Sequence, residues 1–568
     1  MMSEVAKAAL ETIADHQGVL PKDIMLAPSG THLGAADMPE KPPEYVFRAA
    51  ARRTIQGNII PGFNKDHQHF LFFRMGDVCR ARRWLVAIRP SISSMEEVLT
   101  FVRAHRALRL RRGEAEPGLK ATWVNIAFSY GAISTLVGPE DSTAFGEQSF
   151  RQGLTARSTY LGDPTDPAHP GHRANWVVGS PGNEADILLM VASDDPGDLE
   201  DMTSTLRADA GDHGLQLLFE QRGDTLPEGL RGHEHFGFKD GISQPGVRGK
   251  VSAKRGDFIT PRYLVPRFPG DQMPHLFARP GQPLVWPGQF LLGQPRQDPE
   301  NFFARRPPAI NFPEWARLGS YVVCRRLRQD VPAFWEFCAE GAAAVGVPVV
   351  EFASRLVGRW PSGAPLMRAS TADNPVLAGD PFAVNNFLFD DMTRPSALRP
   401  IPGYPGDSHP HADADMLGAV CPHFSHIRKM NPRDSVTDLG KPADTLTRVI
   451  LRRGIPYGPP VAGVKNPPPE LMEQERGLMF LCYGATIEDQ FEFVTRRWAN
   501  SSAQPNSGGH DPVIGQRDDG GVRSRWLDFP TGSGARRFDL LHEWVVPTGG
   551  GYFFAPPIDA IDGVLASA

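Results

Sequence analysis

A strand–helix pattern that occurs in both halves of the chain restricts the fold most strongly. In the first half we predict strands over residues 69–74, 122–128, 185–191 and 215–220, and helices over 77–87 and 196–208. In the second half, strands over 320–325 and 477–482 lead into helices over 330–339 and 487–498. Two such sets favour a duplicated α+β architecture, in which each half has a sheet with helices on one face. A single large mixed sheet is the alternative.

Proline and glycine are abundant between these units. The 568 residues include 57 Gly and 54 Pro, and the ordinary share of proline is only about 5%. So many helix breakers exclude a coiled coil or a long helical bundle. A hydrophobic content of 41% is enough for a core, which argues against a disordered chain. The breakers cluster in four long loops, over residues 162–174, 360–412, 459–469 and 500–521.

Charge and cysteine content exclude several classes of protein. The chain has 60 Lys and Arg against 65 Asp and Glu, so it lacks the excess of positive charge that is typical of proteins that bind nucleic acid. Its five cysteines are scattered without a C-x-x-C pair, which suggests neither a disulfide framework nor a zinc ribbon. No apolar run approaches the roughly 18 residues of a membrane span, and no signal peptide is recognisable. We therefore expect a cytoplasmic protein without nucleic-acid or membrane partners.

Two histidine pairs have a spacing that suits metal ligands. They are His233-Glu234-His235 and His409-Pro410-His411. A non-haem metalloenzyme needs a third ligand with defined geometry, so a pair alone is weak evidence. Histidines in surface loops are the simpler interpretation.

A more distinctive histidine lies in residues 421–433, CPHFSHIRKMNPR. Pro422 suits the first turn of a short helix, and Pro432 ends it. On this helix His426 lies off the apolar face, so it is not a simple core histidine. Two basic residues follow it directly and are suited to neutralise an acidic group of a ligand. From this segment alone, an exposed histidine is still the simpler interpretation.

An aspartate and a pair of arginines lie in two further segments. Asp240 lies in residues 236–246, FGFKDGISQPG, where an aspartate between glycines normally indicates a turn. The flanking aromatic residues predict partial burial, which would raise the pKa of Asp240 towards values useful for proton transfer. Arg452 and Arg453 lie where an apolar strand ends at a turn. From this segment alone, surface charges at a strand end are the simpler interpretation.

Taken together and in this order, the three segments resemble the motifs of the dye-decolourising (DyP-type) haem peroxidases. Residues 237–241, GFKDG, look like the family's GxxDG motif. Residues 421–433 are similar to its proximal-histidine segment, and residues 452–458 to its distal-arginine segment. The resemblance extends over about residues 54–560.

The resemblance implies roles for individual residues. His426 would be the proximal ligand of the haem iron. Asp240 would be the distal acid–base residue. Arg452 would contact the cofactor and stabilise charge on the departing peroxide oxygen. Arg453 is the rival for that role, because a shift of one residue in strand register exchanges the two.

Further positions follow from the same resemblance. Leu478 and Phe480 alternate along one strand and would line the distal pocket. The proximal histidine is expected to bond a carboxylate or a carbonyl, with Glu488 and Asp489 as candidates. Three aromatic residues are candidates for a surface electron relay: Tyr457, Trp498 and Trp526.

The implied fold is α+β, with two ferredoxin-like halves that have antiparallel sheets and peripheral helices in a dimeric α+β barrel-like arrangement. We expect four parts: an N-terminal extension over 1–52, a first half over 53–250 with the GxxDG motif, connecting loops over 251–318 and a haem-binding half over 319–568.

The implied activity is that of an oxidoreductase with haem b (iron protoporphyrin IX). It would reduce hydrogen peroxide through an oxo-ferryl intermediate and oxidise dyes, phenols or other aromatic donors. The alternative is a haem-binding or haem-handling protein with little turnover. Asp240 and Arg452 argue against this alternative, because storage of haem requires no distal acid–base pair. The oligomeric state cannot be predicted from these patterns.

Overall fold

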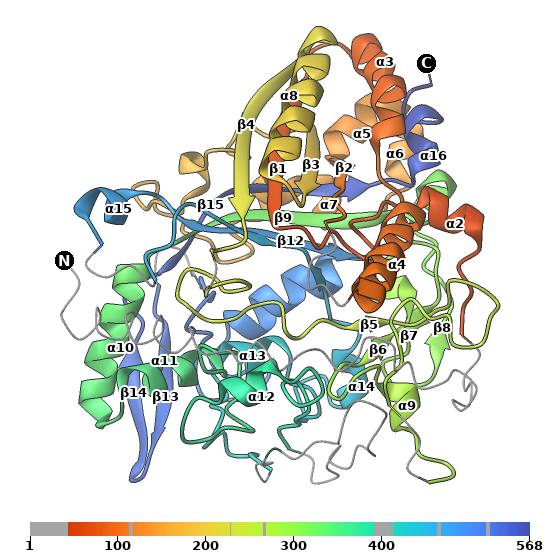
Figure 1. Ribbon diagram of the computed structural model, residues 1–568. Helices are drawn as coiled ribbons and strands as arrows, with labels where there is room; N and C mark the ends of the chain where they lie inside the picture. Colours follow the sequence, from red (N-terminus) through yellow and green to blue (C-terminus); the bar gives the residue numbers. More distant parts are fainter. Residues whose placement is uncertain are drawn as a thin grey trace.

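The computed structural model describes residues 44–112, 118–227, 229–264, 268–390, 409, 414–462, 467–517 and 523–567. Most of the predicted extension and part of the loop at 360–412 therefore lie outside the described residues. A long antiparallel sheet crosses the middle of the molecule (Figure 1).

The first half of the chain forms a ferredoxin-like unit. Its strands are β1 (His67–Met75), β2 (Thr122–Phe128), β3 (Ile187–Ser193) and β4 (Leu215–Asp224), and its main helices are α3 (Val78–Ile88), α4 (Met95–Arg112) and α8 (Pro196–Asp212). The strands lie in the order β2-β3-β1-β4. Asp77 and Asp195 cap α3 and α8 by accepting backbone N–H groups of the first turn, which fixes where these helices begin. The predicted strands and helices are confirmed, with small differences at their ends.

The second half repeats this arrangement. Its elements are β9 (Ser320–Gln329), α10 (Val331–Val345), α11 (Val349–Val357), β10 (Leu451–Arg452), β11 (Ile455–Tyr457), β12 (Gly477–Gly484), the π-helical segments η5 (Ile487–Glu492) and η6 (Val494–Ala499), and β15 (Val545–Ala555). The strands follow the order β10-β12-β9-β15, and β11 also pairs with β12. Strands β10 and β11 together correspond to β2 of the first half. They pair with β12, the third strand of the second half, as β2 pairs with β3, the third strand of the first half.

The two halves join edge to edge into a single sheet of nine strands. The junction lies between β15 and β2, where Phe554 pairs with Phe128. The expectation of a separate sheet in each half is therefore wrong, and the single large sheet of the alternative is found. This sheet is not mixed, because all its ladders are antiparallel. At the other edge, Gly223 of β4 lies against Ile455 of β11, which gives the sheet a barrel-like curvature.

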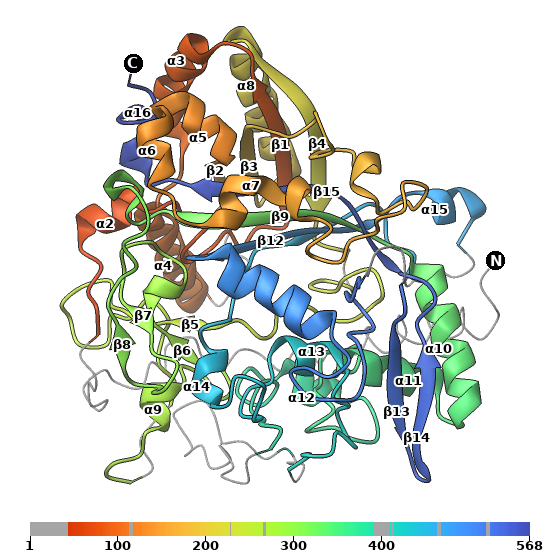
Figure 2. The ribbon, with the colours of Figure 1, turned by 180° about the vertical axis from the view of Figure 1, so that it is seen from behind.

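Both faces of the sheet are buried. In β1, Leu71 and Phe73 pack into one apolar cluster, while Phe70 and Phe72 pack into another on the opposite face. This double burial explains why the strands read as continuous apolar runs. Helices α3 and α8 pack into the cluster that contains Leu71 and Phe73, whereas Met95 and Leu99 of α4 pack into the cluster on the opposite face. In the views of Figures 1 and 2, α3 and α8 lie above β9 and β12, and α10 and α11 lie below them.

Shorter elements complete the described part of the chain. The helices are α2 (Ala49–Thr54), α5 (Tyr130–Val137), α6 (Pro139–Thr143), α7 (Gln148–Arg157), α9 (Met273–Leu276), α12 (Pro375–Gly379), α13 (His426–Met430), α14 (Pro442–Thr445), α15 (Pro469–Glu473) and α16 (Ile558–Asp562). The strands are β5 (Gly246–Val247), β6 (Leu284–Val285), β7 (Arg296–Gln297), β8 (Arg305–Arg306), β13 (Trp526–Thr531) and β14 (Gly534–Asp539). The segment expected as connecting loops over 251–318 thus includes α9 and β6 to β8. The four-part division of the chain remains a prediction.

In the described ranges, no single helix has both the length and the apolar composition of a membrane span. Helices α10 and α11 meet these criteria only as a pair, and the pair is bent by 110°.

Candidate active site

His426 is the first residue of α13, and a buried carboxylate fixes its ring. Its Nδ1 lies 2.9 Å from Oδ2 of Asp511, a residue that is fully buried. The other carboxylate oxygen, Oδ1, accepts the backbone N–H groups of Val513 and Ile514 at 2.8 and 3.0 Å. Asp511 is therefore held rigidly, and it orients the imidazole through Nδ1.

The sequence-based candidates for this partner, Glu488 and Asp489, are wrong. Glu488 accepts the backbone N–H of Ser149 at 2.8 Å, and Asp489 pairs with Arg448 at 3.2 Å. The π-helical segment η5 directs both side chains towards other partners.

The charges of the pair stabilise each other. Burial opposes the charge of His426, but Asp511 outweighs this effect and raises the pKa of the imidazole. Burial likewise opposes the charge of Asp511, but His426 and the two backbone N–H groups lower the pKa of the carboxyl. Nε2 of His426 has no hydrogen-bond partner among the residues that the structure describes, which leaves this nitrogen available to a ligand.

A second ion pair joins Asp240 and Arg452. Nη1 of Arg452 lies 2.7 Å from Oδ1 of Asp240, which also accepts the backbone N–H of Gly241 at 2.6 Å. Gly241 has a φ of 75°, a left-handed conformation that favours glycine at this turn. The amide side chain of Gln244 bonds both backbone groups of Arg452, at 3.2 and 3.3 Å, and so ties the loop to β10.

The predicted direction of the Asp240 pKa is wrong. Desolvation of the carboxyl acts to raise it although the side chain is 44% exposed, but the charge of Arg452 outweighs this effect. The hydrogen bonds that Gly241 and Arg452 donate to Asp240, and the charge of His426, lower the pKa further. The pKa is therefore lowered, and Asp240 is a carboxylate at neutral pH.

Strand register places Arg452 and Arg453 on opposite faces of the sheet. Arg452 pairs with Cys482, so its side chain shares a face with Leu478 and Phe480, four and two residues before Cys482. Leu478 and Phe480 are partly exposed, while Met479 between them is fully buried.

Arg453 lies on the opposite face and contacts the first half of the chain. Its guanidinium donates to the backbone carbonyls of Asn58, Ile59 and Pro61 at 3.0 to 3.1 Å, and to that of Arg452 at 2.9 Å. These bonds give Arg453 a structural position away from Asp240.

Two arginines beside this site, the buried Arg359 and the partly buried Arg433, escaped the sequence analysis. Arg359 and Arg433 converge on the side chain of Asn385, and Arg359 also lies 3.2 Å from the hydroxyl of Ser243. Burial lowers the pKa of Arg359 to about 9 and that of Arg433 to about 10. Within the described ranges, neither guanidinium forms an ion pair with a carboxylate. The position of Arg433 in the 421–433 segment is the only sequence signal for this cluster.

Comparison with known proteins identifies the family. The DyP dimeric α+β barrel domain matches residues 54–223, and the C-terminal domain of Dyp-type peroxidases matches residues 387–507. Peroxidase 2 of Mycetinis scorodonius is 31% identical over 526 residues, which cover 90% of this chain and 87% of that protein. The chain belongs to the DyP-type peroxidase family. The sequence-based family assignment, fold class and enzyme class are confirmed.

Solved structures show the same fold. An ancestral D-type dye-decolorizing peroxidase superposes on this DyP-type peroxidase with a TM-score of 0.70 at 31% identity, over 91% of this chain and 99% of that one. The dye-decolorizing peroxidase of Auricularia auricula-judae gives a TM-score of 0.65 at 27% identity, over 91% of this chain and 100% of that one. Proteins of this family depend on haem, and the comparisons do not favour the haem-handling alternative.

His233, His235 and His409, the members of the two histidine pairs that the structure describes, do not form a metal centre in this DyP-type peroxidase. His233 and His235 have their Nε2 atoms beside the carbonyls of Pro361 and Tyr457, at 3.1 and 2.9 Å. His409 lies 3.5 Å from Asp380, and His411 is outside the described residues. Where side chains are described, no three or more His, Cys, Asp or Glu residues form a group able to hold a metal ion.

The candidates for a surface relay are mostly not at the surface. Tyr457 and Trp498 are only 2% and 1% exposed, so their prediction as surface residues is wrong. Trp526 is half-buried.

Proposed function

We propose that this peroxidase holds haem b between His426 and the Asp240–Arg452 pair, with hydrogen peroxide as the oxidant. Dyes, phenols or other aromatic compounds would be the electron donors. The observation that carries the proposal is the bond between Nδ1 of His426 and the buried Asp511, which leaves Nε2 free within reach of the charges of the Asp240–Arg452 ion pair. The proposal thus joins two segments far apart in the chain into one site.

The residues around this site fit haem b. His426 has a free Nε2 for iron and a carboxylate on Nδ1, the arrangement typical of a histidine that binds a metal. Arg359 is buried and Arg433 is partly buried, and neither has a carboxylate partner in the described part of the chain, which suits the two propionates of this cofactor. Leu478 and Phe480 offer apolar contacts on the face that carries Arg452.

Asp240 is suited to move the proton of the peroxide. Oδ1 is occupied by Arg452 and Gly241, so Oδ2 is the atom that accepts a proton from peroxide and returns it to the outer oxygen. Arg452 holds Asp240 ionised before this step and stabilises negative charge as it develops on the leaving oxygen. When bound, haem supplies the iron that binds peroxide and the redox centre that donors later reduce.

A spectrum and two variants test this function. Protein supplemented with haem should show an intense Soret band, and its absence would rule out a haem peroxidase. Asp240→Ala and Arg452→Leu should bind haem as the wild type does but react more slowly with peroxide. Equal peroxide rates in all three proteins would show that the distal assignment is wrong.

A further inference from the structure

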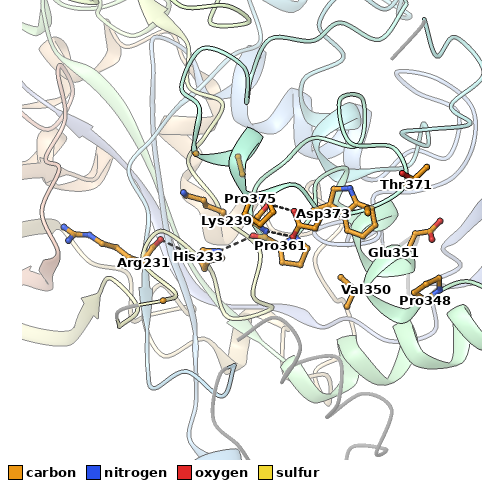
Figure 3. A pocket seen from close by; sticks show the side chains of 16 residues that line it. Arg231, His233, Lys239, Pro348, Val350, Glu351, Pro361, Thr371, Asp373 and Pro375 are labelled. Atoms are coloured by element: carbon orange, nitrogen blue, oxygen red, sulfur yellow. Dashed lines mark hydrogen bonds between the residues drawn. The ribbon is translucent and has the colours of Figure 1, made fainter. Parts of the chain in front are cut away.

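A cavity lies beside the loop that carries Asp240. Its walls come from four parts of the chain: residues 229–239, 348–351, 360–362 and 371–379 (Figure 3). Asp240, Arg452 and His426 do not line it, so it is distinct from the site proposed for haem. Its volume of about 310 Å³ is at the small end of ligand pockets and accommodates one substituted aromatic ring.

Part of the lining is apolar and rigid. Trp360 is only 5% exposed, and its indole N–H donates to the carbonyl of Ala369 at 2.6 Å, which fixes the orientation of the ring system. Val350, Pro361 and Pro375 add further apolar surface. Such walls favour the face of a planar aromatic molecule.

Lys239 is the polar feature that selects the charge of a ligand. It directly precedes Asp240, and its backbone N–H donates to the carbonyl of Pro361 at 3.2 Å. The side chain lines the cavity and is half-buried, and its ammonium makes no hydrogen bond or ion pair with any residue that the structure describes. Burial lowers the pKa of this ammonium. An anion beside it would offset the cost of burying an unpaired charge.

The other charged side chains of the lining already have partners. Arg231 pairs with Asp66 at 2.6 Å, Glu351 pairs with Arg355 at 2.9 Å, and Asp373 accepts the backbone N–H of Ser362 at 3.3 Å. The ring nitrogens of His233 face two backbone carbonyls, and burial lowers its pKa to about 4, so this histidine is neutral at pH 7. Lys239 therefore remains as the group that recruits an anion.

We propose that this cavity binds a small aromatic carboxylate or sulfonate, with the acidic group paired to Lys239 and the ring against Trp360. Binding requires neither peroxide nor turnover. Such a site would concentrate acidic aromatic donors next to the distal loop, and this consequence alone rests on the proposed peroxidase function.

Isothermal titration of the haem-loaded protein without peroxide tests the site. The probes are 4-hydroxybenzoate and 4-hydroxybenzenesulfonate, with neutral 4-hydroxybenzamide as the matched control. Lys239→Met should weaken binding of both anions about tenfold, the effect expected for one partly buried ion pair. Lys239→Arg should restore most of the affinity, and Lys254→Met, at an exposed lysine, should leave it unchanged.

A second variant locates the ligand. Val350→Phe fills the cavity without altering Lys239 and should weaken binding of the anions at least as strongly as Lys239→Met. If both anions bind Lys239→Met and Val350→Phe as tightly as the wild type, or if neither binds the wild type better than the amide, the proposal is wrong. In steady-state assays, Lys239→Met should raise KM for the sulfonate and not for the amide. Because the titration contains no peroxide, its failure is distinguishable from a failure of the peroxidase function.

Discussion

Replacing Arg453 with methionine should destabilise the protein, whereas the same change at Arg452 should impair its reaction with peroxide. Arg453 donates to four backbone carbonyls at 2.9 to 3.1 Å, and three of them belong to residues 58–61 of the first half. Methionine fills a similar volume but leaves these acceptors without their donor. The change thus weakens a contact between the end of β10 in the second half and the turn at residues 58–61 of the first half.

The magnitude follows from the bonds lost. Each unsatisfied buried acceptor costs roughly 1–3 kcal/mol, but removal of this partly buried guanidinium, which has no acidic partner among the described residues, recovers several kcal/mol of desolvation. We expect a net decrease of about 3 kcal/mol in the free energy of unfolding. The Arg452–Asp240 pair is partly exposed, so Arg452→Met should change stability by less than about 1 kcal/mol. Loss of its charge should slow the peroxide reaction roughly 10²–10³-fold.

Urea unfolding followed by circular dichroism gives the stabilities, and stopped-flow mixing with peroxide gives the rates. Both variants are measured as haem-loaded protein at one pH. The reasoning is refuted if Arg453→Met unfolds like the wild type and slows the peroxide reaction as strongly as Arg452→Met.

Three further variants test other parts of the account. Asp240→Asn should retain haem and slow the peroxide reaction about 10²–10⁴-fold in stopped-flow experiments; an unchanged rate would exclude Asp240 as the proton carrier. Asp511→Ala should weaken haem affinity about 10–100-fold in a haem-transfer assay, because the imidazole of His426 loses its partner. Glu488→Gln is the control and should retain haem. Burial raises the pKa of Glu147 from 4.5 to about 7, so ionisation of this residue destabilises the folded state. The free energy of unfolding should therefore fall by about 3 kcal/mol more in the wild type than in Glu147→Gln between pH 4.5 and pH 8; parallel profiles would contradict this.

The repeated strand–helix units were predictable because their signals are local. Apolar runs define the strands, and aspartates such as Asp77, Asp195 and Asp330 accept N–H groups where helices begin. How the two sheets join was not predictable, because a single paired position between β15 and β2 links elements more than 400 residues apart.

The candidate site was likewise predictable from local sequence signals but not in its tertiary contacts. Its histidine, aspartate and arginine segments lie in recognisable motifs, but their partners depend on tertiary contacts. Asp511 lies 85 residues from His426, and nothing near either residue indicates the pairing. The direction of the Asp240 pKa was missed for the same reason, since its decisive neighbour, Arg452, is 212 residues away. Strand register, which separates Arg452 from Arg453, is likewise set by pairing with β12.

The central claim is that His426 binds the iron of haem through Nε2. Electron paramagnetic resonance of the ferric, haem-loaded protein tests this most directly, by comparing the wild type with His426→Gly before and after addition of imidazole. We predict that the nitrogen coupling of an axial imidazole is present in the wild type, absent in the variant and restored by free imidazole. An unchanged axial-nitrogen signal in His426→Gly without added imidazole would contradict the account.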